Sequence, residues 1–583
     1  MNIPVTEKTI TTAEARARLE TVNPIASPKD ADDTTTRFPP SPRLSKLEGK
    51  TIGLFWNGKA LGNVALERVE QQLAKRYKTA RFIHYIGVNG PQLRRATPAQ
   101  LDQIARECDA VVGASADCGS CCSWLIHEMC ELERRGVPAV AITAEGFEED
   151  AHWSAKIFGC PEVQLMVTPL AITSQPVELI HEMIDGAIDK LIVGLTVKTY
   201  EPEGEFAHHV RVTDPATFSY EGADLLDCFD RMNAQFIEKG WSDGLPLVPP
   251  TPDKVAAMVA ASGRAADEVV GIFEPGFGVG TVEKIAANAV MAGCRPEAMP
   301  VVLAVAEALL VPRYGLRCLA MSTGPQHPLI VVSGPYAKAI GMNSGCCALG
   351  PGSLSAVNVA IGRSSRLIMM NVGLSYPAVS DMDTIGSTGK FGACVAENEA
   401  RTPWRPLRVQ KGFDAVSTTV TLHAPYAVSD VTDFYNSTPE AVVESFCKAA
   451  RNAAVTGCAV WLVNTSVGDD VEGPFHGDWD PMVMLSPDHA DVFKNAGWSD
   501  DQVRKAIFKG ARVPFREAMH SEPPELFEKS NPHLQWLWDN PDTPVSIYKN
   551  PEQIDLVVVG QDAPRSLFWY GGTASTTVEV KIP

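Results

Sequence analysis

The residues in this chain best suited to chemistry are two cysteines, Cys118 and Cys121, in the segment ADCGSCCSW. The two-residue spacing is typical of redox pairs, because it allows the two sulfur atoms to close a small disulfide ring. Gly119, between them, permits a tight turn. We therefore predict a thiol site in which Cys118 and Cys121 are catalytic.

The elements around the pair favour the same interpretation. The apolar run DAVVGAS predicts a strand and LIHEMCELE predicts a helix, which places Cys118 at the turn from strand to helix. Ligands of open parallel sheets bind at such turns, and the free N–H groups and dipole of a helix start favour a thiolate. Asp117 and Ser120 are expected to orient or deprotonate the thiol, Ser120 by a hydrogen bond to the thiolate.

The remaining cysteines, of 14 in the chain, need separate interpretation. Most are expected to be small core residues: Cys108, Cys130, Cys160, Cys294, Cys318, Cys394, Cys447 and Cys458. Cys122 fits either a core or a functional role. Cys346 and Cys347 lie in the glycine-rich turn GMNSGCCALGPGS, where they either line a substrate pocket, exchange with a second thiol pair or are structural.

Metal and nucleotide motifs receive little support. The Cys118–Cys121 spacing is half of a zinc site, but no second half lies at a usable distance. Asp381 and Asp383, and the stretch 469–480 (DDVEGPFHGDWD), offer oxygen ligands without the fixed offsets of a calcium loop. No GxSxG, HExxH or GxxxxGK[ST] motif occurs. We predict no metal site and no bound cofactor, with an external thiol as the reductant.

Composition limits the partners. Across 583 residues, 51 basic and 70 acidic side chains give a net charge of −19, which disfavours nucleic acid and anionic membrane surfaces as partners. The N-terminus lacks the apolar core of a signal peptide, and the longest apolar stretch, 299–312, is interrupted by Glu307. We expect a cytoplasmic protein with reduced cysteines that acts on a small molecule, and a homo-oligomer as most such chains are.

The chain divides into four predicted segments. Residues 1–45 are polar and proline-rich and predict an extended arm. Residues 46–198 form the domain that carries the thiol site, and 199–222 lack periodicity and predict a linker. Residues 223–583 predict a second α/β domain, and the stretch from about 435 is either a third lobe or the completion of the second.

Short apolar runs alternate with helical stretches from Thr51 onward, as in TIGLFW, ALERVEQQLAKRY and ARFIHYIG. This alternation indicates a parallel sheet covered by helices on both faces. We predict an α/β fold with a doubly wound, five-stranded sheet of flavodoxin-like or related order, followed by a larger mixed α/β domain.

The segments PRLSKLEGKTIGLFWNGK and GASADCGSC resemble the UGSC-motif family, in which selenocysteine or cysteine takes the first motif position, here Cys118. The resemblance covers mainly residues 41–195 and implies a thiol- or selenol-dependent enzyme. Asn57 and Lys59 match the family pattern and are carried over as substrate-binding candidates, although a polar turn explains them equally well. Gly119 is a further substrate-binding candidate. The layout is also similar to aspartate/glutamate racemase-like folds and to selenoprotein subunits of amino-acid reductases, an analogy of fold alone.

Three functional hypotheses follow. In the first, a thiol-dependent oxidoreductase, Cys118 attacks or reduces a small substrate and Cys121 resolves the intermediate as a disulfide. In the second, the same cysteines serve a cofactor-independent isomerase, lyase or dehalogenase. In the third, the protein is a non-catalytic redox sensor or ligand-binding protein. The segment from Trp241 to Trp404 resembles a domain found joined to UGSC-type domains, which implies no chemistry.

Overall fold

Five apolar segments of the N-terminal part form one parallel sheet in the computed structural model, which describes residues 17–28, 37–88, 94–197, 215–456, 479–518 and 535–583. The strands are β2 (Thr51–Trp56), β3 (Arg81–Ile86), β4 (Ala110–Ala116), β5 (Ala139–Ala144) and β6 (Gln164–Thr168), in the order β3-β2-β4-β5-β6. Strands β2, β4 and β5 are buried throughout, whereas the edge strands are not. The order is the flavodoxin-like one, so the predicted fold class is confirmed.

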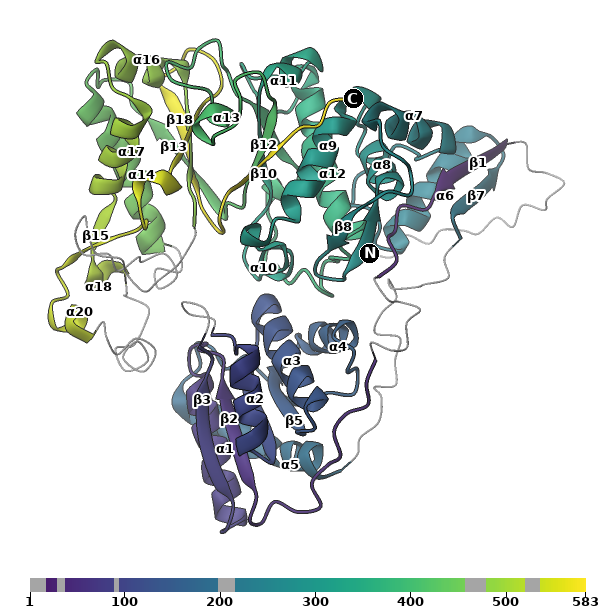
Figure 1. Cartoon of the computed structure of the whole chain (residues 1–583), viewed down its shortest axis with the longest axis vertical. Helices are drawn as coiled ribbons and strands as arrows, with labels where there is room; N and C mark the ends of the chain where they lie inside the picture. The colour runs from purple at the N-terminus through teal and green to yellow at the C-terminus, as the bar shows by residue number, and fades with distance from the viewer. Residues whose placement is uncertain (1–16, 29–36, 89–93, 198–214, 457–478, 519–534) are drawn as a thin grey trace.

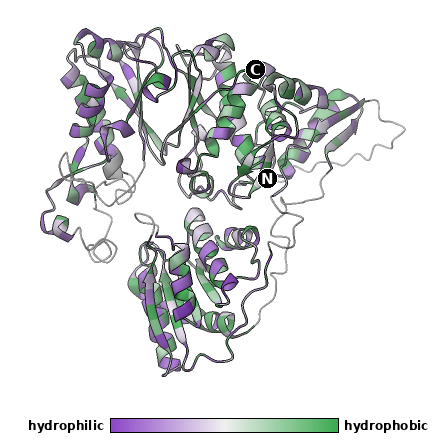
Figure 2. Ribbon diagram, in the orientation of Figure 1, coloured by the Kyte–Doolittle hydropathy of each residue, from purple (hydrophilic) through white to green (hydrophobic). Residues whose placement is uncertain are grey.

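Helices cover both faces of this sheet. One face packs against α1 (Gly62–Arg76) and α5 (Val177–Thr196). The other packs against α2 (Pro98–Glu107), α3 (Gly119–Arg134) and α4 (Glu148–Ile157). The apolar side chains follow this division, with hydrophobic residues concentrated in the strands (Figure 2). The thiol turn lies at the start of α3, at the carboxyl edge of the sheet.

The predicted arm and linker are corrected by a strand pair. Residues 17–22, placed in the arm, form β1, and residues 217–222, placed in the linker, form β7; the two strands pair antiparallel. Residues 23–28 then pack on the second part of the chain, which comprises the described residues from 215 onward. There, Lys284 and Asn288 donate hydrogen bonds to the backbone carbonyls of residues 23 and 24. The two strands are about 200 residues apart in the sequence, and each is too short to show a clear hydrophobic period. The sequence therefore does not predict that they pair. Residues 198–214 of the predicted linker lie outside the described residues.

The second part contains two four-stranded mixed sheets. The first has the order β11-β10-β12-β19, from Ala393–Ala396, Leu329–Ser333, Thr419–His423 and Thr576–Glu579. Its core is closed by helices α7 (Pro252–Ser262), α8 (Val282–Met291), α9 (Met299–Leu309) and α12 (Ala356–Asn371).

The second sheet has the order β13-β18-β14-β17, from Ala427–Thr432, Arg565–Tyr570, Met482–Leu485 and Asp555–Val558. Helices α14 (Pro439–Thr456), α16 (Pro487–Asn495) and α17 (Asp500–Gly510) pack on it. A shared apolar cluster, including Val331, Val395, Met484 and Val557, joins the two sheets, and β19 returns the chain to the first. The stretch from about 435 therefore completes the second part.

Smaller elements connect these layers. They are α6 (Leu225–Glu238), β8 (Val269–Phe273), β9 (Gly278–Thr281), α10 (Leu316–Met321), α11 (Pro335–Ala339), α13 (Leu407–Gln410), β15 (Arg512–Pro514), α18 (Phe515–Ala518), α20 (Gln535–Asp539) and β16 (Pro544–Ser546). Among the described residues, no single helix has the length and apolar character to cross a membrane. The consecutive segments Pro296–Leu309 and Pro312–Met321 meet both criteria only when they are taken together, and they are bent by 71° relative to each other.

Candidate functional site

Cys118 and Cys121 lie where the sequence predicted them, at the turn between β4 and α3. Cys118 is the extended residue before the helix, and its carbonyl accepts the first helical hydrogen bond, from the Cys122 N–H at 2.7 Å. The Cα atoms of Cys118 and Cys121 are 5.3 Å apart and their sulfur atoms form a disulfide. The N–H groups of the first turn of α3 have no partner within the helix, so the sulfurs lie at the positive end of its dipole.

Burial separates the three cysteines of this turn. Cys118 is 8% exposed, Cys121 is 2% exposed and Cys122 is fully buried. Burial, and then the neighbouring Asp150 carboxyl, raises the pKa of Cys122 well above its usual range. Cys122 is therefore a neutral thiol of the core. Of the two roles that the sequence left open for it, the structure supports the core role. Of the pair, Cys118 is the more accessible to a reaction partner.

Asp117 is held as a carboxylate at the end of β4. Burial alone would raise the pKa of Asp117, but the ion pair with Lys59 and hydrogen bonds from the Thr173 N–H and hydroxyl, both at 3.0 Å, lower it. The Ser115 hydroxyl donates a further bond at 3.1 Å. A carboxylate with a low pKa is a weak base, so these contacts favour orientation of the turn over deprotonation of Cys118.

Asn57 joins two strand ends. Its side-chain amide donates to the Ser115 carbonyl at 2.9 Å, and its carbonyl oxygen accepts the Ser115 N–H at 3.0 Å and the Lys59 N–H at 3.3 Å. These bonds fix the loop after β2 against the end of β4 and bring Lys59 to Asp117. The structure thus assembles Asn57, Lys59 and Asp117, and substrate contact by Asn57 and Lys59 stays a prediction.

Gly119 and Ser120 occupy the first turn of α3. A Cβ atom added at Gly119 would lie 1.7 Å from the carbonyl oxygen of Met321 and 2.9 Å from the Met382 side chain. Gly119 is therefore required for close approach of the second part to the thiol turn. Ser120 is half-buried and has no side-chain hydrogen bond among the described residues, so the predicted bond to the Cys118 thiolate stays untested.

The contact between the two parts centres on Arg317 of α10, a residue that the sequence analysis missed. Arg317 is 1% exposed, and its guanidinium donates to the Ser123 hydroxyl of α3 at 2.6 Å and to the Pro275 carbonyl at 2.7 Å. Its guanidinium carbon lies 5.4 Å, 4.9 Å and 5.0 Å from the ring centres of Trp124, Phe158 and Phe277. Trp124 lies three residues after Cys121, and its aromatic side chain is the one sign of this contact beside the thiol motif in the sequence.

An apolar contact reinforces this interface. Trp153 of α4 is 1% exposed and packs in one cluster with Met321, Leu374 and Ile25 of the second part. In Figure 1, α3 and α4 face the side of the second part that carries α10, and α3 contacts α10. The thiol turn therefore lies at the boundary between the two parts and is covered by residues from both.

Cys346 and Cys347 lie elsewhere, in the turn before α12. Both thiols are exposed, and their sulfur atoms are 3.7 Å apart, within hydrogen-bond distance but without a disulfide bond. Their carbonyls accept hydrogen bonds from Asn343 and Ser355 of the same turn, at 2.8 Å and 2.6 Å. The contacts are local to the turn, and none gives support for exchange with Cys118.

The first acidic cluster is paired with cations. Asp381 accepts from Arg366 at 2.7 Å and from Lys390 at 3.0 Å, and Asp383 pairs with Lys390 at 2.8 Å. Residues 469–478 of the second cluster lie outside the described residues. Within the described part of the chain, no group of three or more His, Cys, Asp or Glu residues is arranged to hold a metal ion.

Comparison with known proteins agrees with this geometry. The model of the UGSC family matches residues 22–197, which include the whole five-stranded sheet and the thiol turn. No curated protein matches the chain. The two cysteines of the Cys118-Gly119-Ser120-Cys121 motif stand at the start of α3, and the α/β domain that carries them, called the UGSC domain below, matches the UGSC family over residues 22–197.

Proposed function

We propose that this protein is a thiol-dependent oxidoreductase that acts on a small molecule through Cys118 and Cys121. The observation that carries the proposal is the bonded pair itself: two cysteines in disulfide geometry at the dipole-positive start of α3, at the carboxyl edge of a parallel sheet. This edge is where open α/β sheets bind ligands. The fully buried, neutral Cys122 beside the pair offers no competing nucleophile.

The reaction begins with the reduced pair. The Cys118 thiolate attacks the electrophilic atom of a two-electron acceptor, such as a disulfide sulfur, and the leaving group departs with the bonding electrons. The Cys121 thiolate then attacks Cys118 and releases the reduced product. Two electrons pass from the dithiol to the substrate, and the Cys118–Cys121 disulfide remains. An external thiol reduces it again, a supply that the cytoplasm would provide.

The residues around the pair have separate roles in this proposal. The free N–H groups of α3 stabilise the Cys118 thiolate. Asp117, Lys59 and Asn57 fix the turn at the end of β4. Because the pair is nearly buried between the two parts, the small substrate reaches Cys118 when the contact between α3 and α10 loosens.

The decisive experiment uses the full-length reduced protein and an aromatic disulfide as the oxidant, with peptides identified by mass spectrometry. We expect wild type to form the Cys118–Cys121 disulfide, and Cys121→Ser to retain a mixed disulfide on Cys118. Cys130→Ala, a buried cysteine of the same helix, is the matched control and should behave as wild type. Labelling of Cys118 by iodoacetamide should report a pKa below that of a free thiol.

Two results would overturn the proposal. If Cys118 in Cys121→Ser forms no adduct while exposed Cys346 does, the pair is structural. If substrate turnover requires Cys118 but no Cys118–Cys121 disulfide accumulates, the chemistry is the non-redox isomerase, lyase or dehalogenase type.

A further inference from the structure

A second set of chemical groups lies far along the chain from the thiol turn, where the two sheets of the second part meet. A cavity of about 460 Å³ opens there, and its walls include Arg313, Lys411 and Asp480. The walls also include Ser575 and Thr576, at the start of β19. None of the residues that line it belongs to the UGSC domain.

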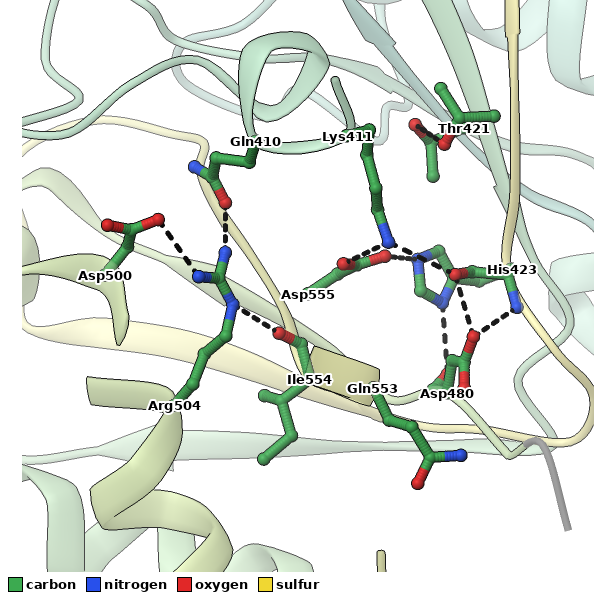
Figure 3. Close-up of polar contacts among 12 residues, drawn as sticks. Gln410, Lys411, Thr421, His423, Asp480, Asp500, Arg504, Gln553, Ile554 and Asp555 are labelled. Carbon is green, nitrogen blue, oxygen red and sulfur yellow. Dashed lines mark hydrogen bonds and ion pairs between the residues drawn. The ribbon is translucent and has the colours of Figure 1, made fainter. Parts of the chain in front are cut away.

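A buried ion cluster forms one side of this cavity (Figure 3). Lys411 pairs with Asp555 at 2.6 Å, and the second oxygen of Asp555 lies 2.9 Å from His423 Nε2. His423 Nδ1 lies 3.1 Å from the Asp480 carbonyl oxygen, which can only accept. The Lys411 ammonium and the hydrogen bond with His423 lower the pKa of Asp555 despite its burial, so Asp555 is an acceptor too. Each ring nitrogen of His423 thus lies within hydrogen-bond distance of an acceptor oxygen.

This cluster is positioned by a further buried arginine. Arg504 donates to the Ile554 carbonyl at 2.9 Å and to the Gln410 side chain, and it pairs with Asp500 at 3.0 Å. Gln410 immediately precedes Lys411 in the chain, and Ile554 immediately precedes Asp555. Figure 3 shows the Arg504 guanidinium bonded to both Gln410 and Ile554. Arg504 thus holds the backbone carbonyl before Asp555 and the side chain before Lys411.

Lys411 keeps donor capacity for a ligand. An ammonium group has three N–H donors. The Lys411 ammonium bonds Asp555, and Ser575 Oγ lies at the limit of its reach, at 3.5 Å. Its side chain is 23% exposed at the cavity. Arg313, 57% exposed, approaches Asp480 only to 3.5 Å. Three cationic residues, Arg313, Lys411 and Lys549, thus line the cavity beside the carboxyl groups of Asp480 and Glu552. Asp555, the partner of Lys411, also bonds His423.

Asp480 supplies a polar atom without a partner. Its Oδ2 accepts from the Ser575 N–H at 2.7 Å and hydroxyl at 2.9 Å, whereas Oδ1 has no hydrogen-bond partner among the described residues. The residue is only 3% exposed. An unsatisfied buried oxygen costs stability unless a ligand or water bonds it. Burial, with Asp555 nearby, raises the pKa of Asp480, and in either protonation state Oδ1 can bond a hydroxyl.

We infer that this cavity binds a small hydroxylated oxyanion, a hydroxycarboxylate or a phosphate ester. Lys411 and Arg313 bind its anionic oxygens, and Asp480 Oδ1 bonds its hydroxyl. The ligand must carry both an anionic group and a hydroxyl. Lys411 and Arg313 would bind any anion, whereas Asp480 disfavours an anion that has no hydroxyl to donate to it. The site is independent of the thiol chemistry.

The test is isothermal titration of the full-length protein with three probes: glycolate, acetate and inorganic phosphate. We expect glycolate to bind more tightly than acetate, because only glycolate carries a hydroxyl for Asp480. Tight phosphate binding would identify a phosphate ester as the natural class, and preference for glycolate a hydroxycarboxylate. Asp480→Asn should reduce the preference for glycolate over acetate.

Arg313→Gln should raise the dissociation constant of the preferred probe about tenfold, because a charge-assisted contact at an exposed rim is lost. Arg313 is exposed, so this variant should fold even if Lys411→Gln does not. Arg565→Gln is the matched control: Arg565 is 58% exposed and pairs with Asp430 at the far end of β18. Binding of no probe by wild type, or equal loss in both arginine variants, would overturn the inference.

Discussion

Three cysteines within five residues differ in chemistry because their surroundings differ. Cys118 precedes α3, Cys121 lies in its first turn, and Cys122 points into the core beside Asp150. The type and spacing of Cys118 and Cys121 could be read from the sequence, as could the turn that holds them. The core role of Cys122 could not, because burial depends on which face of α3 meets the sheet.

The Lys59–Asp117 ion pair gives the first prediction at this scale. Lys59→Met leaves a buried carboxylate without its cation and should lower the free energy of unfolding at pH 7 by about 3 kcal/mol. The pKa of Asp117 is lowered in the folded protein, so its stabilising effect exists above the unfolded pKa and disappears as pH falls through the folded pKa. The difference between wild type and Lys59→Met should therefore shrink below about pH 4.

Denaturant unfolding at pH 7 and pH 3.5 measures this difference. The double variant Lys59→Met/Asp117→Asn is the control, since it removes the unpaired charge and should recover part of the loss. A difference that is constant with pH would show that Lys59 acts through packing.

Glu128, on the thiol helix, should have the opposite pH dependence. Burial raises the pKa of Glu128 to about 8, although the Ala96 N–H at 2.8 Å opposes the shift. The folded state then holds a proton that the unfolded state releases near pH 4.5, so stability falls as pH rises from there to about 8. Glu128→Gln mimics the protonated form and keeps the bond to Ala96.

We expect Glu128→Gln to match wild type near pH 5 and to exceed it by about 3 kcal/mol at pH 7.5, because the proton linkage is about 1.4 kcal/mol per pH unit. Melting temperatures at the two pH values measure the gain. The same gain at both values would contradict a buried, protonated Glu128.

Helix α3 links the thiol turn to both the sheet and the second part. Its buried face packs on β4, and its start lies against Met321 at the end of α10. The alternation of strands and helices predicts α3, because each helix of a doubly wound fold directly follows its strand in the sequence and packs on the same sheet. The contact with α10 joins residues nearly 200 apart in a short helix with no distinctive pattern, so no local signal indicated it.

Gly119→Ala tests this contact. The added Cβ would overlap the Met321 carbonyl, so the start of α3 must move away from α10. We expect a loss of about 2–4 kcal/mol in stability and faster iodoacetamide labelling of reduced Cys118.

Gly186→Ala is the matched control, because Gly186 lies in α5 with open space around its Cβ position. That substitution should stabilise the protein by about 0.5–1 kcal/mol through helix propensity and leave Cys118 labelling unchanged. Equal stability of the two variants would mean that α10 does not press on the thiol turn.

At the scale of the whole molecule, long-range pairing organises the chain. Strand β1 pairs with β7 across the UGSC domain, and β19 returns to β12, so both ends of the described chain lie in the second part. The sequence predicted two α/β parts but not these pairings, because short strands with distant partners carry little periodicity. Their consequence is that the UGSC domain is inserted between β1 and β7, and is tied to the second part through the thiol turn.

We expect Arg317 to contribute much of the free energy that keeps the two parts in contact. It is a buried cation bonded to Ser123 of the UGSC domain and packed against aromatic rings from both parts. Arg317→Met keeps a side chain of similar length but removes the bonds and the charge. We expect the contact between the two parts to weaken by about 2–4 kcal/mol, with a larger radius of gyration by X-ray scattering and faster labelling of Cys118.

Arg408→Met is the matched control, since Arg408 is also buried but bonds Ser333, Glu399 and the Ala415 carbonyl, within the second part alone. That variant should lower the melting temperature without changing either the radius of gyration or the labelling rate. If Arg317→Met also changes only the melting temperature, closure rests on the apolar contact of Trp153 instead, and access to the Cys118–Cys121 pair does not depend on Arg317.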